Sequence, residues 1–152
     1  MDGLYRQNVG IVLCNNKNLV LWCERKDLHG QWQFPQGGIE KGETIVEAAR
    51  RELQEETSVT SVKLVAQIDA PLKYDFPPDV AARFKKKGQE MCWVLFRFEG
   101  SESEINLKTK EPEFRDWMWV DIDETTKKIV EFKKDVYSKM VEYFKPYLTE
   151  GK

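Results

Sequence analysis

The 152-residue sequence is poor in histidine and cysteine. Its single histidine, His29, excludes a histidine-rich metal site, and no serine or cysteine nucleophile motif accompanies it. The three cysteines, Cys14, Cys23 and Cys92, form no C-x-x-C pair, so the sequence predicts neither a disulfide framework nor a thiolate zinc site. We expect His29 to lie in a loop, and Cys14 and Cys23 to be buried as small apolar residues.

A strong net charge and long apolar segments are also absent. Lysine and arginine total 24 and acidic residues 26, so the formal net charge is −2 and binding of nucleic acid through overall positive charge is not expected. No apolar run approaches the ~18 residues of a membrane span, and the N-terminus has no signal-peptide pattern. We therefore expect one domain over residues 1–152 that works in the cytoplasm without a membrane partner.

Short apolar runs and two helical patterns organise the chain. The runs predict strands over residues 8–14, 19–23, 62–68, 91–98 and 117–120. A capping box of Thr44 and Glu47 predicts a helix from Thr44 to about Thr57. A second helix, with Pro146 at its expected end, carries an apolar stripe of Phe132, Val136, Met140, Tyr143, Phe144 and Tyr147. This order predicts an α+β or mixed α/β arrangement in layers.

The first predicted helix carries a concentration of carboxylates. At 100° per residue, Glu52, Glu55 and Glu56 continue the apolar face that should meet the sheet. A solvated acidic face is the alternative, but each pair of like charges three or four residues apart costs about 3 kcal/mol at an effective dielectric of ~20. The helix dipole also disfavours anions near a C-terminal end. We therefore interpret the cluster as a site for hard divalent cations, with Mg²⁺ as the expected ion.

The residues around this helix match a known motif. They are Gly37, Glu43, Arg51, Glu52, Leu53, Glu55, Glu56, Ser58 and Val59. Their spacing resembles the Nudix box of Nudix hydrolases, G-x5-E-x7-R-E-U-x-E-E-x-G-U, with Ser58 in place of the usual glycine. A serine in the left-handed turn of that glycine costs roughly 1–2 kcal/mol. We expect local strain or a shifted helix cap at Ser58, with the chemistry retained.

Further segments extend the resemblance over nearly the whole chain. Residues 5–10, 32–38, 112–114 and 132–137 look like the Y-R-P-N-V-G, W-Q-F-P-Q-G-G, P-E-F and F-K-R-D-V-Y segments of one branch of the family. That branch contains bacterial RNA pyrophosphohydrolases and diadenosine polyphosphate hydrolases, and Gln7 replaces its usual proline. The resemblance implies a Nudix-type α/β/α sandwich with a mixed sheet.

The resemblance also implies which residues hold the metal. The expected ligands are the carbonyl of Gly37 and the carboxylates of Glu52, Glu55, Glu56 and Glu113. The catalytic set would be Glu55, Glu56, Glu113 and Arg51, and which of the three carboxylates activates the attacking water stays open. We expect Arg51 to pair with Glu43 and orient the loop against the helix, and plain surface charges are the alternative.

A nucleoside polyphosphate is the implied substrate, and two or more Mg²⁺ ions are the implied cofactors, with Mn²⁺ or Zn²⁺ as alternatives. The first expectation is removal of pyrophosphate from 5′-triphosphorylated RNA, which would promote mRNA decay. Hydrolysis of diadenosine polyphosphates is the alternative, and hydrolysis of free or oxidised nucleoside triphosphates is a third. A non-catalytic nucleotide-sensing Nudix module would typically lack box glutamates, and a calcium-binding acidic domain would need a D-x-[DN]-x-[DN]-G loop, which is absent.

Substrate contacts outside the box are implied at Arg6, Arg25, Gln36, Phe132 and Lys133. Arg6 and Arg25 match positions that contact the phosphate chain, and Phe132 with Lys133 matches positions around the first bases. Taken alone, Phe132 is also consistent with a core residue. The basic run over residues 83–88 would either guide RNA or form a solvated loop, and the sequence leaves both open.

Overall fold

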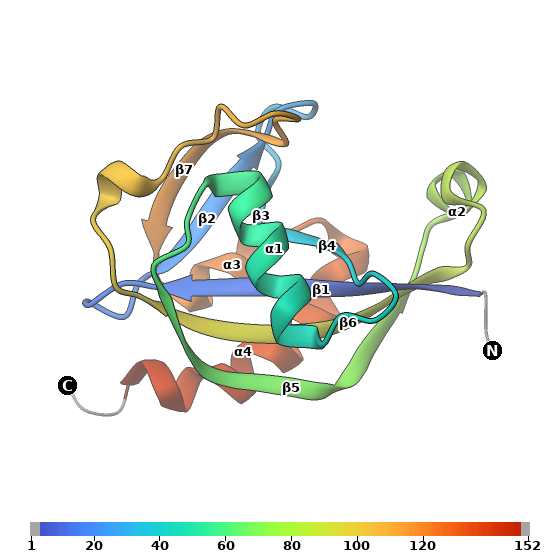
Figure 1. Ribbon diagram of the computed structural model, residues 1–152. Coiled ribbons are helices and arrows are strands. Elements are labelled where there is room, and N and C mark those ends of the chain that lie inside the picture. The colour runs from blue at the N-terminus through green and yellow to red at the C-terminus, as the bar shows by residue number, and fades with distance from the viewer. Residues whose placement is uncertain (1–3, 150–152) are drawn as a thin grey trace.

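In the computed structural model, which describes residues 4–149, a mixed sheet lies between helices (Figure 1). The strands are β1 (Tyr5–Cys14), β2 (Val20–Arg25), β3 (Trp32–Gln33), β4 (Gln36–Gly38), β5 (Val62–Asp75), β6 (Gly88–Phe98) and β7 (Phe114–Val120). The helices are α1 (Ile45–Thr57), α2 (Pro78–Phe84), α3 (Ile122–Lys128) and α4 (Lys134–Thr149), with 3₁₀ turns η1 (Glu102–Glu104) and η2 (Glu131–Lys133).

The centre of the sheet is a parallel pair. Strands β1 and β6 run side by side from Tyr5 and Gly88 to Cys14 and Arg97, and the other pairings of the sheet are antiparallel. The strand order is β3-β2-β1-β6-β5, with β7 on β2 and β4 on β1. One edge of β1 therefore changes partner, from β4 at its N-terminal half to β2 at its C-terminal end.

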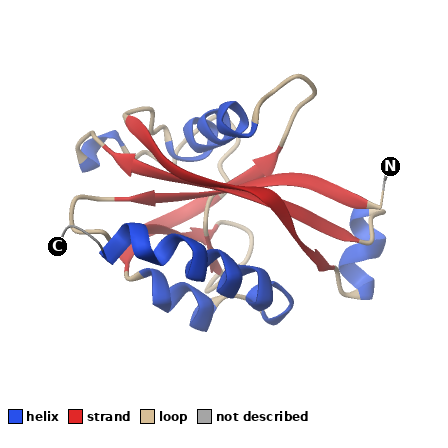
Figure 2. Ribbon diagram, turned by 90° about the horizontal axis from the view of Figure 1, so that it is seen from below, coloured by secondary structure: helices blue, strands red, loops and turns tan. Residues whose placement is uncertain are grey.

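Helices cover both faces of this sheet, as Figure 2 shows. Helix α1 packs on one face, whereas α3 and α4 lie together on the other. Two apolar cores result, and both use alternate residues of β1: Val9, Ile11 and Leu13 face α1, whereas Val12 and Cys14 face α4. The predicted α/β/α sandwich with a mixed sheet is confirmed.

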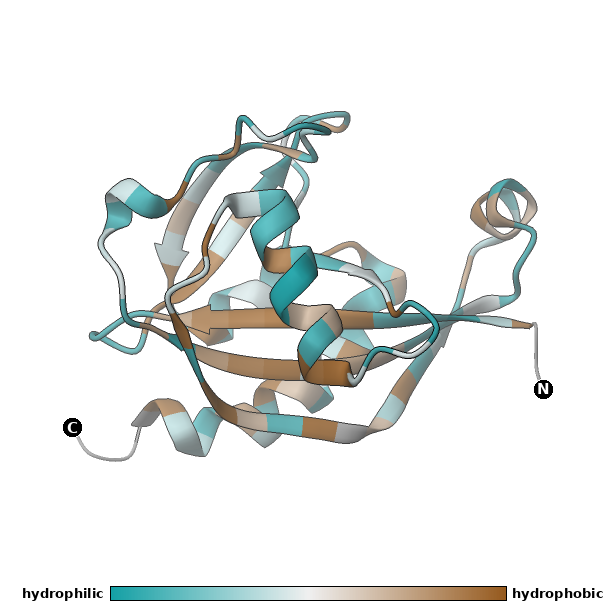
Figure 3. Ribbon diagram, in the orientation of Figure 1, coloured by the Kyte–Doolittle hydropathy of each residue, from teal (hydrophilic) through white to brown (hydrophobic). Residues whose placement is uncertain are grey.

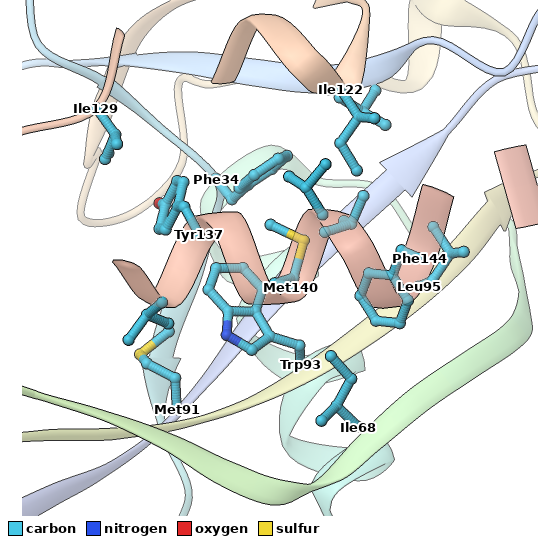
Figure 4. Packing of buried hydrophobic residues seen from close by; sticks show 14 of the residues in the cluster. Phe34, Ile68, Met91, Trp93, Leu95, Ile122, Ile129, Tyr137, Met140 and Phe144 are labelled. Carbon is cyan, nitrogen blue, oxygen red and sulfur yellow. The ribbon is translucent and has the colours of Figure 1, made fainter. Parts of the chain in front are cut away.

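The core beneath α4 is built from aromatic rings (Figure 4). Trp93 of β6 contacts the rings of Phe34 and Tyr137 at centroid distances of 5.8 and 5.3 Å, and all three are fully buried. Gly10 of β1 gives the indole its room, because a β-carbon there would overlap the ring of Trp93. In Figure 3 the central strands are correspondingly apolar and the outer face of α1 is hydrophilic.

The start and the end of α1 follow the sequence expectations. Thr44 caps the helix, with Glu47 completing the capping box. Ser58 ends it in the left-handed conformation, with φ of 69°, as expected for a residue in the place of a glycine. Its hydroxyl donates a hydrogen bond to the carbonyl of Asn106 at 2.8 Å, which offsets part of the conformational cost.

Several expectations for individual residues are confirmed. His29 lies exposed in the loop between β2 and β3, and all three cysteines are buried thiols outside any disulfide. Within residues 4–149, no helix is long and apolar enough to cross a membrane.

Other expectations were wrong. Pro146 lies inside α4, because Leu148 is buried against the core and holds the last turn beyond the proline. In the same helix Tyr143 and Tyr147 are exposed, so the apolar stripe is narrower than its spacing suggested. Arg83 and Phe84 end helix α2 and do not belong to a loop. Strands β3 and β4 and helix α3 were not predicted, and β5 continues seven residues past its expected end at Ile68, to Asp75.

Candidate active site

A cleft of about 490 Å³ opens beside the N-terminal half of β1, where β1 pairs with β4. We call it the main cleft. The residues predicted from the sequence that line it are Arg6, Arg25, Gln36, Gly37, Glu52, Glu56, Glu113, Phe132 and Lys133. Residues from five elements and a loop thus converge at one place, and of the predicted set only Glu55 and Arg51 are outside its lining.

Three cations lie on one side of the main cleft. The guanidinium of Arg6 donates a hydrogen bond to Gln89 at 3.2 Å, and that of Arg25 forms a fork with Asp27 at 3.1 and 2.9 Å. Lys133 is buried, with 8% of its surface exposed. Burial, with the nearby charges of Arg25 and Arg6, lowers the pKa of Lys133 to about 8. A polyanion would relieve this repulsion.

Two carboxyl groups of α1 meet on the opposite side. The carboxyl groups of Glu52 and Glu56, one helical turn apart, lie close enough to interact, and both line the main cleft with Gln36. Burial, followed by the interaction with Glu52 and the charge of Glu113, raises the pKa of Glu56 to about 10. Burial also raises the pKa of Glu52. Without a cation, this pair therefore holds a proton at neutral pH.

Glu55 and Glu113 lie near the pair of Glu52 and Glu56, and both are exposed to solvent. Glu55 lines a neighbouring cavity of about 650 Å³ together with Glu52, Glu56 and Glu113, and we call this the side cavity. The side chain of Glu55 is 58% exposed and pairs with Arg51 at 3.3 Å. Glu113 is exposed in the loop before β7 and lines both spaces. The carboxylates therefore stand between the two cavities.

Arg51 connects the loop before α1 to the helix. Its guanidinium donates two hydrogen bonds to Glu43, at 2.6 and 2.9 Å, and a third to the carbonyl of Gly38 at 2.8 Å. These bonds to Arg51 lower the pKa of Glu43 to about 2. Arg51 also donates to Glu52 at 2.8 Å, so it fixes both the loop and one of the paired carboxylates. The predicted pair of Arg51 and Glu43 is present.

Glycine is required at position 37 by contact with α1. A β-carbon on Gly37 would overlap the carboxylate of Glu52. The backbone of β4 and the carboxylate therefore approach each other so closely that a side chain at position 37 would displace the carboxylate of Glu52. This close approach is what would let a carbonyl of β4 and a helix carboxylate share one ion.

The donor set fits a hard divalent cation. Glu56 Oε1 is buried and accepts no hydrogen bond, and the side-chain oxygens of Asn8 and Gln36, which line the same cleft, are in the same state. Buried acceptors without donors are costly, and a cation or its water ligands would satisfy them. Within residues 4–149, no three histidine, cysteine, aspartate or glutamate side chains stand close enough to form a ready-made cage. Glu55 or Glu113, both exposed, would have to turn inward.

Four aromatic rings follow one wall of the main cleft. Phe132 contacts Tyr74 at 5.6 Å, Tyr74 contacts Phe76 at 5.9 Å, and Phe76 contacts Phe84 at 5.3 Å between centroids. We call them the aromatic row. Phe132 is half-buried in this row, so it lines the cleft and packs at the edge of the core at the same time. The two interpretations of Phe132 are therefore compatible.

Sequence reasoning missed several lining residues. They are Asn8, Leu28, Gln31, Gln33, Tyr74, Phe76, Val80, Gln89, Phe114 and Val130, with Arg83 and Phe84 noted only as part of a basic run. Several of them, including Tyr74, Val80 and Gln89, reach the cleft from β5, α2 and β6, which are distant from the box in sequence. Gln89 is a polar residue at the start of β6, next to a long apolar run, and its position there could have been noticed.

A match between the sequence and a known domain family identifies the family of this chain. Residues 4–140 match the NUDIX domain. The chain belongs to the Nudix family. It is therefore a Nudix pyrophosphohydrolase, of a family whose enzymes generally use a divalent metal such as Mg²⁺.

Curated relatives are similar over most of the chain. An RNA pyrophosphohydrolase of Pelagibacter ubique is 42% identical over 147 residues, which are 94% of this chain and 93% of that protein. An RNA pyrophosphohydrolase of Caulobacter vibrioides is 44% identical over 94% of this chain and 87% of its own length. Nudix hydrolase 26, a chloroplastic protein of Arabidopsis thaliana, is 41% identical over 95% of this chain and 71% of its own.

Solved structures share the fold at lower identity. The E. coli dihydroneopterin triphosphate pyrophosphohydrolase superposes with a TM-score of 0.69 at 17% identity, over 92% of this chain and 99% of that one. An Ap4A hydrolase of C. elegans superposes with a TM-score of 0.67 at 18% identity, over 93% and 98% of the two chains. These likenesses support the Nudix-type sandwich described above.

Proposed function

We propose that this enzyme removes pyrophosphate from the 5′-triphosphate end of RNA and leaves a 5′-monophosphate. The observation that carries the proposal is the main cleft, in which cations face paired carboxylates and an aromatic wall continues beyond them. The bacterial relatives named RNA pyrophosphohydrolase support the same substrate. Such an enzyme would act in the cytoplasm, as one domain over residues 1–152, and would promote mRNA decay.

Each wall of the cleft has its own task in this proposal. Arg6, Arg25 and Lys133 bind the phosphate oxygens, and Phe132 contacts a base. Gln36, which lines the same cleft, orients the phosphate chain by hydrogen bonding. Because a planar guanidinium binds two oxygens of one phosphate and an ammonium binds as a point charge, the arginines fix orientation and Lys133 supplies affinity.

The carboxylates and the Gly37 carbonyl would hold the metal, with Mg²⁺ in two or more positions as the proposed ions and Mn²⁺ or Zn²⁺ as alternatives. Glu52 and Glu56 would be ligands from the main cleft, and Glu55 and Glu113 would reach the metal from the side cavity. A divalent cation there lowers the pKa of a bound water and neutralises charge on the leaving phosphate. Arg51 holds Glu52 in place and does not touch the substrate.

The reaction needs no nucleophilic side chain. A water oxygen attacks the α-phosphorus, and the bond from that phosphorus to the oxygen bridging the α- and β-phosphates breaks. Pyrophosphate leaves with the electron pair of that bond. One of Glu55, Glu56 and Glu113 accepts the proton of the water.

The second candidate is hydrolysis of dinucleoside polyphosphates, which would place a polyphosphate on the same ions. The deciding experiment compares turnover of 5′-triphosphorylated RNA and of diadenosine tetraphosphate by the purified protein with Mg²⁺. We expect a higher kcat/KM with RNA. A higher value with diadenosine tetraphosphate would reverse the order of the two candidates, and no turnover of either would reject both.

A further inference from the structure

Helix α2 is the part of the molecule that the proposed function leaves unexplained. It stands apart from the sheet beside the N-terminal end of β1 (Figure 1). None of its seven residues is buried, so it contributes little to either core. Nevertheless it places Val80, Arg83 and Phe84 in the lining of the main cleft.

Phe84 is the unusual residue of this helix. An aromatic side chain normally buries most of its surface, but 41% of Phe84 is exposed. Its ring closes the aromatic row at the end opposite Phe132 and is covered in part by the guanidinium of Arg6, 4.5 Å from the centroid. A cation–π contact to Arg6 fixes the ring without burying it. The guanidinium of Arg83 lies 5.9 Å from the same centroid, so two cations hold the ring in position while 41% of the residue stays exposed.

Positive charge accompanies this ring. The segment from Arg83 to Lys87 contains four cations and no acidic residue, and we call it the basic segment. Arg83, Lys85 and Lys87 of this segment are exposed, and the Lys87 ammonium lies 5.9 Å from the ring of Tyr5. In a chain with a net charge of −2, this local concentration would attract a polyanion to the open end of the cleft.

We propose that α2 binds single-stranded RNA downstream of its first two nucleotides, with Phe84 stacking on a base and the basic segment following the phosphates. The combination of flat aromatic rings and a cationic track is the general chemistry of single-strand binding, because every base has a face that can stack. The aromatic row lines the cleft from Phe132 to Phe84, its adjacent rings are 5.3 to 5.9 Å apart, and Phe84 is its exposed end. This inference rests on the proposed RNA substrate and extends it along the chain.

The role of α2 is tested with 5′-monophosphorylated oligoadenylates of two, four and six nucleotides, which resemble the product and keep binding separate from turnover. We expect the affinity of the wild-type protein to rise about tenfold from two to six nucleotides. Phe84→Ala should remove this rise and leave the affinity for the dinucleotide within twofold of wild type. Phe84→Leu, which keeps apolar volume but not a flat ring, should retain only a small part of it.

A matched control comes from α4. Tyr143 is 50% exposed but does not line the cleft, so Tyr143→Ala removes an exposed ring elsewhere and should leave the length dependence intact. A 2-aminopurine at the third or fourth position should be quenched by the wild-type protein and not by Phe84→Ala. Arg83→Gln with Lys87→Gln should reduce the salt dependence of hexanucleotide binding and not that of dinucleotide binding.

Three outcomes would overturn the inference. They are an affinity that does not change with length, an equal loss on all lengths in Phe84→Ala, and an unchanged length dependence in that variant, which would point to a protein contact at α2. The proposed function is judged separately by turnover of a triphosphorylated dinucleotide, which has no nucleotide beyond the second and therefore none for the site proposed on α2. Turnover of that substrate without length dependence would reject α2 alone, and length-dependent binding without turnover would reject the proposed function alone.

Discussion

The backbone of Gly37 and the carboxylate of Glu52 touch so closely that a single added methyl group could not fit between them. Gly38, the next residue of β4, has open space instead, because the atom nearest to an added β-carbon is the carbonyl oxygen of Gln7 at 3.9 Å. An added side chain is therefore accommodated at Gly38 but not at Gly37. Substitutions at the two positions can be compared to test the proposed metal site.

Gly37→Ala should displace Glu52 from β4 and lower Mg²⁺-dependent turnover at least tenfold, with a higher Mg²⁺ concentration needed for half-maximal activity. Gly38→Ala should leave both quantities within about twofold of wild type. The measurement is turnover as a function of Mg²⁺ concentration, with the melting temperature of each variant as a check on folding. Equal effects of the two substitutions would argue against a site between β4 and α1.

Glu52→Gln and Glu56→Gln should each reduce Mg²⁺-dependent turnover at least a hundredfold, because each removes a charge from the proposed ligand set. The metal-free fold should survive, since the amide of a glutamine at position 56 can donate to Glu52 as the protonated carboxyl does. Near-normal turnover in both variants would reject the assignment of these residues as ligands.

The same substitution of Glu56 has a pH signature in the metal-free protein. The folded pKa of about 10 lies above the ordinary value of 4.5, so the folded state binds more protons than the unfolded state between these pH values. The stability that this proton provides is complete below pH 4.5 and is lost as the pH rises toward 10. Glu56→Gln should therefore raise the melting temperature more at pH 8 than at pH 5. An equal shift at both would show that the Glu56 carboxyl is already ionised.

The parts of this arrangement that the sequence predicted are local ones. The capping box at Thr44 and the periodicity of Glu52 and Glu56 need only the geometry of one helix. Periodicity could not show that Glu55 lies apart from this pair. Its position depends on how closely α1 packs against β4 and on the ion pair between Glu55 and Arg51.

The missed elements depend on distant partners. Strands β3 and β4 are only two and three residues long. They form because β3 pairs with the edge of β2 and β4 pairs with the edge of β1. Pro146 was expected to end α4, but tertiary packing of Leu148 outweighs the local preference. The aromatic row joins residues from β5, α2 and η2, which no short sequence window contains.

Lys133 should make phosphate binding dependent on pH. In the free protein its pKa is lowered to about 8 from an ordinary 10.5, so the ammonium loses its proton as the pH rises through about 8. KM for the polyphosphate substrate should therefore rise between pH 7 and pH 9. Lys133→Arg keeps the charge over this range and should give a flatter KM profile, and identical profiles would exclude Lys133 from the phosphate site.

The free energy of unfolding should also depend on the protonation of Lys133, and it should increase with pH whereas phosphate binding weakens. Because the folded pKa of Lys133 is the lower one, the unfolded chain binds more protons between pH 8 and 10.5, and the free energy of unfolding rises across that range. Lys133→Met removes the buried charge and should stabilise the protein at pH 7, with a gain that shrinks as the pH approaches 10.5. Thermal melts at a series of pH values measure both trends.

Arg25 should contribute less to phosphate binding than its position suggests, because its guanidinium is already engaged by Asp27. Arg25→Ala should raise KM and reduce the slope of log KM against log salt, by about 0.7 for each phosphate of a single strand that the variant no longer neutralises. Asp27→Asn should lower KM, since it releases Arg25. A raised KM in Asp27→Asn would show that the fork holds Arg25 in its binding position.

Phe132→Ala decides between the two substrate classes. A dinucleoside polyphosphate ends after one nucleoside on each side, whereas triphosphorylated RNA continues past its first base. If Phe132 stacks on a base beyond the first, its loss should cost roughly 1–3 kcal/mol with RNA and much less with diadenosine tetraphosphate. The measurement is kcat/KM for both substrates, together with the melting temperature.

The contact of Phe132 with Tyr74 supplies the control for this comparison. Phe132→Leu fills most of the same space without a flat ring, so packing with Tyr74 should largely survive while stacking is lost. Both substrates also use the same carboxylates, and a general defect would therefore lower both activities together. Equal losses on RNA and diadenosine tetraphosphate, with a lowered melting temperature in Phe132→Ala and recovery in Phe132→Leu, would make Phe132 a packing residue. A loss confined to RNA in both variants would make it the residue that recognises the strand.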